Sequence, residues 1–301
     1  MSLSAVLGGL DAWTLALTVV SAGFYGSALV AVGSLPVRLV FPGMPATGYK
    51  ALRRQLVVAA WVGIVLVLLQ WPMQAAFLGG GALAAAVDPF LLGVVFESAQ
   101  GMFILLAVGG LLLVQATVFD RGRLWSVASL LGLLGAVLVL FAFVQVGHTR
   151  DEPRWLLAGL LMLHLAAVAF WIAALHPLRR LAQRASDTDH TILVLTRFGH
   201  VAMGVVGLLL IAGTTLAWIL VGGLQPLLTT AYGQTLLAKL LLVVALLGFA
   251  AWNKWRLVPA LARNEAGVWV RLRRSIAFER VLVAGVLLVT ALLTTAMSPG
   301  R

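Results

Sequence analysis

The chain has 301 residues, of which 62% are hydrophobic and 10% charged, with a formal net charge of +11 and no cysteine. A soluble domain carries roughly a quarter charged residues, so this composition excludes an ordinary water-soluble fold and indicates a chain embedded in lipid. The lack of cysteine excludes disulfides and thiolate metal sites, so any soft metal would be held by methionine or histidine, with carboxylates in support.

Eight segments are long and apolar enough to cross a bilayer as α-helices, which takes about 20 residues each. They cover residues 12–33, 55–78, 98–118, 124–147, 154–178, 197–221, 233–255 and 275–297. The first should remain in the mature protein, because no basic start of a secretory signal precedes it. Residues 79–96 open with three glycines and contain Asp88-Pro89, which predicts an interfacial or re-entrant helix. The sequence therefore predicts an all-α integral membrane protein, a polytopic bundle of about eight transmembrane helices.

The distribution of lysine and arginine predicts how these helices are oriented. Most of the 21 basic residues fall in the connections before the second, fourth, sixth and eighth spans, whereas the opposite connections hold Arg150, Arg154 and Arg301. Cytoplasmic loops carry an excess of lysine and arginine. Both termini are therefore predicted to be periplasmic, and the positive charge indicates topology, not nucleic-acid binding.

His164 lies near the middle of the fifth span, and Trp171, seven residues later, shares its helix face. A neutral imidazole at that depth needs a partner from another helix, a metal or a heme. The sequence leaves two readings open, a histidine that bridges helices and a ligand of copper or heme.

Soft side chains gather at the predicted outer ends of the spans. They are four methionines from four different spans, one histidine and one carboxylate: Met73, Met102, Met162, Met297, His148 and Glu97. Thioethers suit Cu(I), imidazole suits both copper states, and a carboxylate assists at a water-facing entrance. The pattern predicts a copper entry site, and ordinary packing by methionine is the alternative.

The inner ends of the last three spans hold a second polar group, made of Arg197, His200, Asn253, Glu279 and Arg280. An ionised Glu279 would be costly there without a partner. Structural ion pairing is the favoured interpretation, and a copper exit that uses His200 and Glu279 is the alternative. Lys239, inside the seventh span, is expected to extend its ammonium group outward to the interface.

Motifs of common enzyme classes are absent from the sequence. It contains no G-x-x-x-x-G-K-[ST] loop for nucleotides, no H-E-x-x-H zinc motif and no G-x-S-x-G nucleophile turn. A non-enzymatic protein is therefore expected.

Short motifs follow one another in the second half of the chain. They are His164-Leu165, Phe170-Trp171-Ile172, Arg197-Phe198, Gly213-Thr214, the run Tyr232 to Lys239, Asn253 with Pro259, and Arg274-Ser275 with Glu279. In order and spacing, residues 154–299 resemble the CopD family of bacterial copper resistance and copper uptake proteins. One departure is Ala173-Ala174, where the family usually has two glycines. Residues 1–148 match only in their general pattern of spans, so we expect a single membrane domain, 1–301, with an N-terminal four-helix half, 1–148, and a CopD-like half, 149–301.

This resemblance implies a bacterial inner-membrane protein that moves copper from periplasm to cytoplasm, commonly beside a periplasmic CopC-type copper-binding partner. Copper would enter near His148, Glu97 and the methionines, pass His164 and leave near His200 and Glu279. Two alternatives stay open. A b-type heme protein for electron transfer needs two facing histidines at one depth, and a scaffold would deliver copper to another complex without transporting it.

Overall fold

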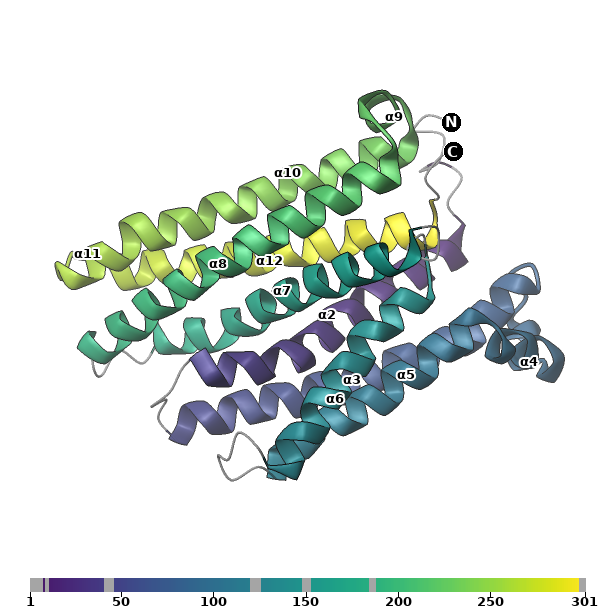
Figure 1. Cartoon of the computed structure of the whole chain (residues 1–301), viewed down its shortest axis with the longest axis horizontal. Coiled ribbons are helices and arrows are strands. Elements are labelled where there is room, and N and C mark those ends of the chain that lie inside the picture. The colour runs from purple at the N-terminus through teal and green to yellow at the C-terminus, as the bar shows by residue number, and fades with distance from the viewer. Residues whose placement is uncertain are drawn as a thin grey trace.

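The chain forms a bundle of long helices (Figure 1). The computed structural model describes residue 8 and residues 11–40, 46–119, 126–147, 153–183 and 188–297. Within these ranges every regular element is a helix, and eight helices are long and apolar enough to cross a membrane. The predicted all-α fold and all eight predicted spans are confirmed.

The eight long helices are α2 (Ala12–Val40), α3 (Ala46–Leu78), α5 (Ala99–Val114), α6 (Val127–Ala142), α7 (Arg154–Leu181), α8 (Thr188–Val221), α10 (Ala231–Trp252) and α12 (Val268–Thr295). Short helical turns extend three of them: η2 (Gln115–Phe119) follows α5, η3 (Phe143–Gln145) follows α6, and η5 (Asn253–Leu257) with α11 (Val258–Ala262) follows α10. A six-residue helix, α9 (Leu224–Thr229), connects α8 to α10. Helices α3, α8 and α12 begin seven or more residues before the predicted apolar spans, because backbone hydrogen bonding continues through charged residues that the apolar criterion leaves out.

The segment between α3 and α5 folds as two short helices at one end of the bundle, η1 (Leu83–Val87) and α4 (Pro89–Glu97). Gly80 and Gly81 adopt φ of 72° and 85°, a left-handed conformation that favours glycine and lets the chain turn back after α3. The Asp88 carboxylate then caps α4 by accepting hydrogen bonds from the Phe90 and Leu91 backbone N–H groups. As predicted, this segment is a short helical excursion and does not form a ninth span.

In a membrane the lipid tails are as apolar as the helix surfaces, so helices associate through close van der Waals packing, which small residues allow. A Cβ atom at Gly33 of α2 would lie 1.9 Å from the backbone oxygen of Ala169 on α7. Similarly, a Cβ at Gly110 of α5 would lie 2.7 Å from the backbone oxygen of Gly135 on α6. Helix α2 thereby packs directly on α7 and joins the first four long helices to the last four.

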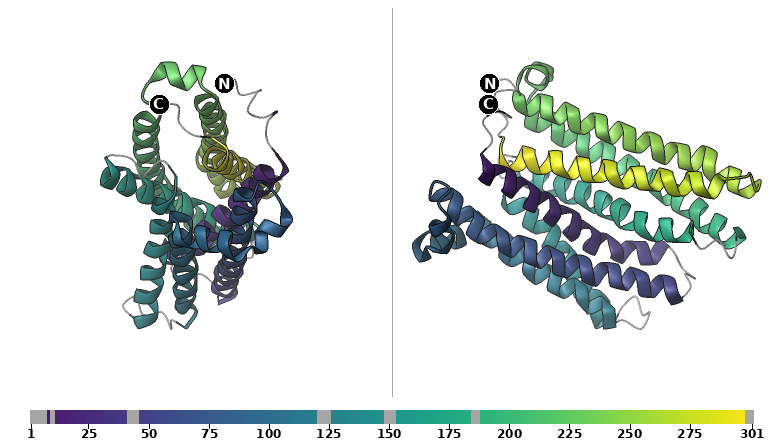
Figure 2. Two further views of the ribbon diagram at one scale, coloured as in Figure 1. Left: turned by 90° about the vertical axis from the view of Figure 1, so that its right-hand side faces the viewer. Right: turned by 180° about the vertical axis from the view of Figure 1, so that it is seen from behind.

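The start of α2 and the end of α12 meet at one end of the bundle (Figure 2). The Thr18 and Thr295 hydroxyl oxygens are 2.8 Å apart, and the Tyr25 and Thr294 hydroxyl oxygens are 2.9 Å apart. The start of α3, the end of α7 and the start of α12, which carry clusters of basic residues, lie at the opposite end. Most of the described basic residues thus lie toward one end of the helices, with Arg154 at the start of α7 and Lys239 inside α10 as exceptions.

Candidate functional site

A cavity of about 140 Å³ lies among α7, α8, α10 and α12. Helix α8 packs along α7 and α10 packs along α12, whereas α8 and α10 make few contacts with each other. Aliphatic side chains form most of the cavity wall, and the polar groups come from His164, Trp171, Thr214 and Lys239. A space of this size accommodates a few water molecules or one small ion with its ligands.

His164 projects from α7 into the wall of this cavity. Its Nδ1 atom is buried and has no hydrogen-bond partner, and its ring approaches the backbone carbonyl of Leu209 on α8. The Nδ1–Cε1 edge faces Gly213, where a Cβ atom would lie 3.1 Å from both ring atoms. The absence of a side chain at position 213 therefore leaves room beside an unpaired imidazole nitrogen, which is the arrangement a metal ligand or a water acceptor needs.

Lys239 of α10 lines the same cavity instead of extending away from it as the sequence suggested. Within the described residues no carboxylate pairs with Lys239 and no hydrogen bond holds its ammonium group. Leu236 and Val243, three residues before and four after it, also line the cavity, so helical spacing directs Lys239 to this face. The sequence contained a signal for this role of Lys239, because a charged residue inside a membrane span is a functional candidate by default. The prediction from the sequence gave Lys239 no role in a site.

Glu279 of α12 is buried, with 4% of its surface exposed, and accepts a hydrogen bond from the Asn253 side-chain amide. The Trp171 indole N–H lies near the same carboxyl group without completing a hydrogen bond. Instead of the expected cation, the structure gives Glu279 a neutral amide as its partner. Consecutive residues of a helix point about 100° apart, so Arg280 lies on another face of α12, in a separate cleft toward α2 and α3.

The backbone places Asn253 in this position through a local change of helix type. Residues Asn253–Leu257 form a π-helical turn between α10 and α11, and such turns are frequent at functional sites. The Asn253 Oδ1 atom and the hydroxyl of Ser275, about one helical turn before Glu279 on α12, are buried without hydrogen-bond partners. This end of the bundle therefore holds a buried polar cluster with unused hydrogen-bonding capacity.

Helix α7 connects the cavity to this cluster. His164 and Trp171 both line the cavity, which confirms the predicted shared face, and Trp171 also approaches Glu279. Polar groups thus follow one another from the cavity toward the basic end of the bundle, in the order His164, Trp171, then Glu279 with Asn253.

The described residues of the predicted copper entry site lie in different surroundings. Met73 is buried in α3, Met102 on α5 is 50% exposed, and Glu97 is exposed at the end of α4. Met162 packs against the core of the first helices, and Met297 packs against residues of α10 and α12. None of the four methionines lines the His164 cavity, and His148 lies outside the described residues. The entry site stays a prediction.

The remaining histidines are distributed over other surfaces. His200 is exposed on α8, and His176 lines the cleft that contains Arg280. No second histidine lines the His164 cavity, and the described residues contain no group of three or more His, Asp or Glu that could hold a metal ion. Within the same part of the chain, the two facing histidines of a b-type heme site are not brought together at this cavity.

Comparison with known proteins finds a family match within the second half of the chain. Residues 192–293 match the family model of copper resistance protein D, CopD. The chain is 29% identical over 256 residues to the copper transport protein CutJ of Bacillus subtilis (strain 168), a match that covers 80% of this chain and 44% of CutJ. It is 34% identical over 140 residues to the inner membrane protein YebZ of Escherichia coli (strain K12), which covers 44% of this chain and 46% of YebZ.

The chain spans less than half the length of these two relatives in the matched regions, and no solved structure matches it. The eight apolar helices and the similarity to an inner membrane protein make it a multi-pass protein of the bacterial inner membrane. Part of the motifs behind the resemblance meets in space, because His164, Trp171, Gly213, Thr214, Leu236 and Lys239 all line this cavity.

Proposed function

We propose that this protein is a member of the CopD family that moves copper across the inner membrane from the periplasm toward the cytoplasm, without enzymatic chemistry and through its C-terminal half, residues 149–301. The observation that carries the proposal is the unpaired Nδ1 of His164, buried in a cavity of the four-helix unit that contains the family match. Imidazole is a good ligand for copper in either oxidation state. The name of the relative CutJ, a copper transport protein, supports the same assignment.

The proposed route has three stages. Copper arrives at the periplasmic end near His148, Glu97 and the four methionines, binds transiently at His164, and leaves past Glu279 toward His200. A cavity with a single imidazole ligand binds a metal ion weakly compared with a three- or four-ligand site, and conduction requires binding that is weak enough to release the ion. The neutral Asn253 partner leaves the Glu279 carboxylate free of a competing cation.

The orientation of the route rests on charge. The starts of α3 and α12 and the end of α7 are basic and lie at the same end of the bundle. Since positively charged loops remain cytoplasmic, we place this end in the cytoplasm and both termini in the periplasm. Copper delivered by a periplasmic CopC-type protein would then reach the opposite end.

Reconstitution tests the proposal directly. The full chain in liposomes that enclose a fluorescent Cu(I) chelator should accumulate copper faster than protein-free liposomes, and His164→Ala should reduce this rate to near the protein-free rate. His176→Ala, which removes a histidine outside the cavity, is the matched control and should transport normally. Wild-type protein that binds copper but gives the protein-free rate would contradict transport and favour delivery to another complex.

A further inference from the structure

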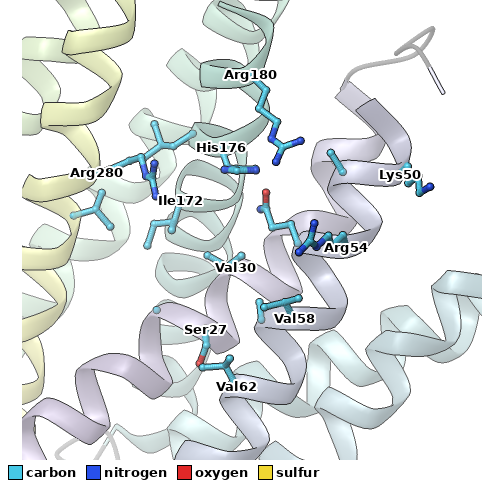
Figure 3. Close-up of a pocket in the computed structure, with 16 residues that line it drawn as sticks. Ser27, Val30, Lys50, Arg54, Val58, Val62, Ile172, His176, Arg180 and Arg280 are labelled. Atoms are coloured by element: carbon cyan, nitrogen blue, oxygen red, sulfur yellow. The ribbon is translucent and has the colours of Figure 1, made fainter. Parts of the chain in front are cut away.

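A second cleft lies away from the His164 cavity, between α2 and α3 on one side and α7 and α12 on the other (Figure 3). Its volume is about 770 Å³. Helix α3 makes few contacts with α7 beside this cleft, so the space separates α3 from α7, whereas α2 packs directly on α7. A ligand bound here would touch both halves of the chain.

Basic side chains from three helices converge on the cleft. Lys50 and Arg54 come from α3, Arg180 from α7 and Arg280 from α12, with His176 of α7 among them. No aspartate or glutamate lines the cleft, and the ion pairs formed in the described part of the chain use Glu265 with Arg263 and Arg271 instead. Like charges held near one another repel, so an anion that bound among these side chains would stabilise the arrangement.

Membrane topology alone does not account for this convergence. The positive-inside rule places lysine and arginine in the loops and at helix ends, whereas Arg280 lies about three turns into α12. Its side chain faces the cleft and makes no ion pair with the adjacent Glu279. A cationic cleft also repels copper ions, which separates it from the proposed copper route.

The rest of the cleft wall is apolar. Val30 of α2, Val58 and Val62 of α3, Ile172 of α7 and Val283 of α12 line it next to the basic residues. A ligand that matches both parts carries a negative head group and a hydrocarbon chain. Arginine suits a phosphate head group because its planar guanidinium donates two parallel hydrogen bonds.

We propose that this cleft binds an anionic phospholipid, with its phosphate among Arg54, Arg180 and Arg280 and an acyl chain along the valines. Basic pockets between transmembrane helices on the cytoplasmic side recognise lipid head groups by the same chemistry. The bound lipid fills the space between α3 and α7, so it stabilises the packing of the two halves. This inference does not depend on copper transport.

Native mass spectrometry of the full chain, stripped of lipid in a neutral detergent, tests the proposal. The probes are phosphatidylglycerol, phosphatidylcholine with the same acyl chains, and inorganic phosphate. Phosphatidylglycerol should bind more tightly than phosphatidylcholine and raise the temperature of unfolding. Each cation near an anionic head group contributes about fivefold in affinity, so Arg54→Gln/Arg280→Gln should weaken phosphatidylglycerol binding by about 25-fold.

Two further variants separate charge from folding. Arg263→Gln/Arg271→Gln removes the same charge from an exposed cluster at the same end of the bundle and should bind phosphatidylglycerol like the wild type. Arg54→Lys/Arg280→Lys keeps the charge but loses the paired guanidinium hydrogen bonds, so it should bind phosphatidylglycerol more weakly than the wild type and still prefer it to phosphatidylcholine, even if the glutamine variant does not fold. Equal binding of the two lipids to the wild type, or equal loss in both glutamine variants, would overturn the proposal. Inorganic phosphate that binds where phosphatidylglycerol does not would overturn the lipid assignment in favour of a free anion.

Discussion

Gly213 on α8 lies against the imidazole of His164 on α7, so close that a Cβ atom at position 213 would be 3.1 Å from both Nδ1 and Cε1. Contacts of this kind are tighter than ordinary van der Waals packing, and the neighbouring group must move to relieve them. The Gly213-Thr214 motif of the family resemblance thus has a steric explanation, because the glycine preserves space at the unpaired nitrogen of His164.

Substituting this glycine should weaken copper binding without unfolding the protein. In Gly213→Ala the added methyl group occupies the space beside Nδ1, and we expect Cu(I) affinity to fall about tenfold, the equivalent of ~1.4 kcal/mol. Alanine favours a helix over glycine by about 1 kcal/mol, which helps the variant to fold. Gly207→Ala, on the same helix with no atom within 4 Å of its added Cβ, is the matched control. Competition with a Cu(I) chelator measures both, and equal affinities would refute the steric role of Gly213.

Lys239 should oppose the entry of copper into the cavity. A protonated amine and a metal cation in one poorly hydrated cavity repel each other, so Lys239→Leu, which removes the charge without adding a copper ligand, should raise Cu(I) affinity by about tenfold or more. Lys254→Leu removes the same charge from a side chain that donates instead to the Gly199 carbonyl, at 2.8 Å. This control should leave affinity unchanged. Weaker copper binding in Lys239→Leu would show that the lysine assists the metal.

The Glu279–Asn253 hydrogen bond should stabilise the folded protein, because it gives the buried Asn253 amide an acceptor. Glu279→Gln keeps an acceptor for the Asn253 amide, whereas Glu279→Leu leaves that buried donor without a partner, which costs about 1–3 kcal/mol. Reversible unfolding in mixed micelles should therefore rank the leucine variant below the glutamine variant. Leucine and glutamine variants of equal stability would contradict the importance of this pairing.

Because α2 and α7 are in close contact at Gly33, a single added methyl group there should lower the stability of the protein strongly. Gly33→Ala would place Cβ 1.9 Å from the Ala169 backbone oxygen, and because backbone atoms move less readily than side-chain ends, we expect a loss of about 1–3 kcal/mol. Gly109→Ala meets no atom within 4 Å and should be neutral or slightly stabilising. Thermal unfolding of the two variants should differ by several degrees, and coincident transitions would contradict the observed packing.

The eight spans could be predicted from the sequence because the thickness of the hydrocarbon layer fixes the number of apolar residues that a helix needs. The helix ends could not, since hydrogen bonding continues through Lys50, Arg53 and Arg54 at the start of α3. The shared face of His164 and Trp171 followed from their seven-residue spacing. Spacing within one helix does not show which neighbouring helix that face contacts. The contact between His164 and Gly213 could therefore be seen only in the structure.

Depth along a helix also proved insufficient to place the other candidates. The four methionines were grouped because they lie at similar depths, yet Met162 and Met297 pack in different clusters, since depth does not determine the direction in which a side chain points. Lys239 was expected to extend outward, but its helix turns it toward His164. Glu279 and Arg280 are adjacent in sequence and face different parts of the bundle for the same reason.

The most direct test of the central claim is the Cu(I) affinity of the purified full chain, measured by competition with a chelator of known affinity. Wild type and His176→Ala should bind copper alike, and His164→Ala should bind at least about tenfold more weakly, because it loses the cavity's imidazole ligand. If His164→Ala binds copper as tightly as the wild type, the cavity among α7, α8, α10 and α12 does not lie on the copper route.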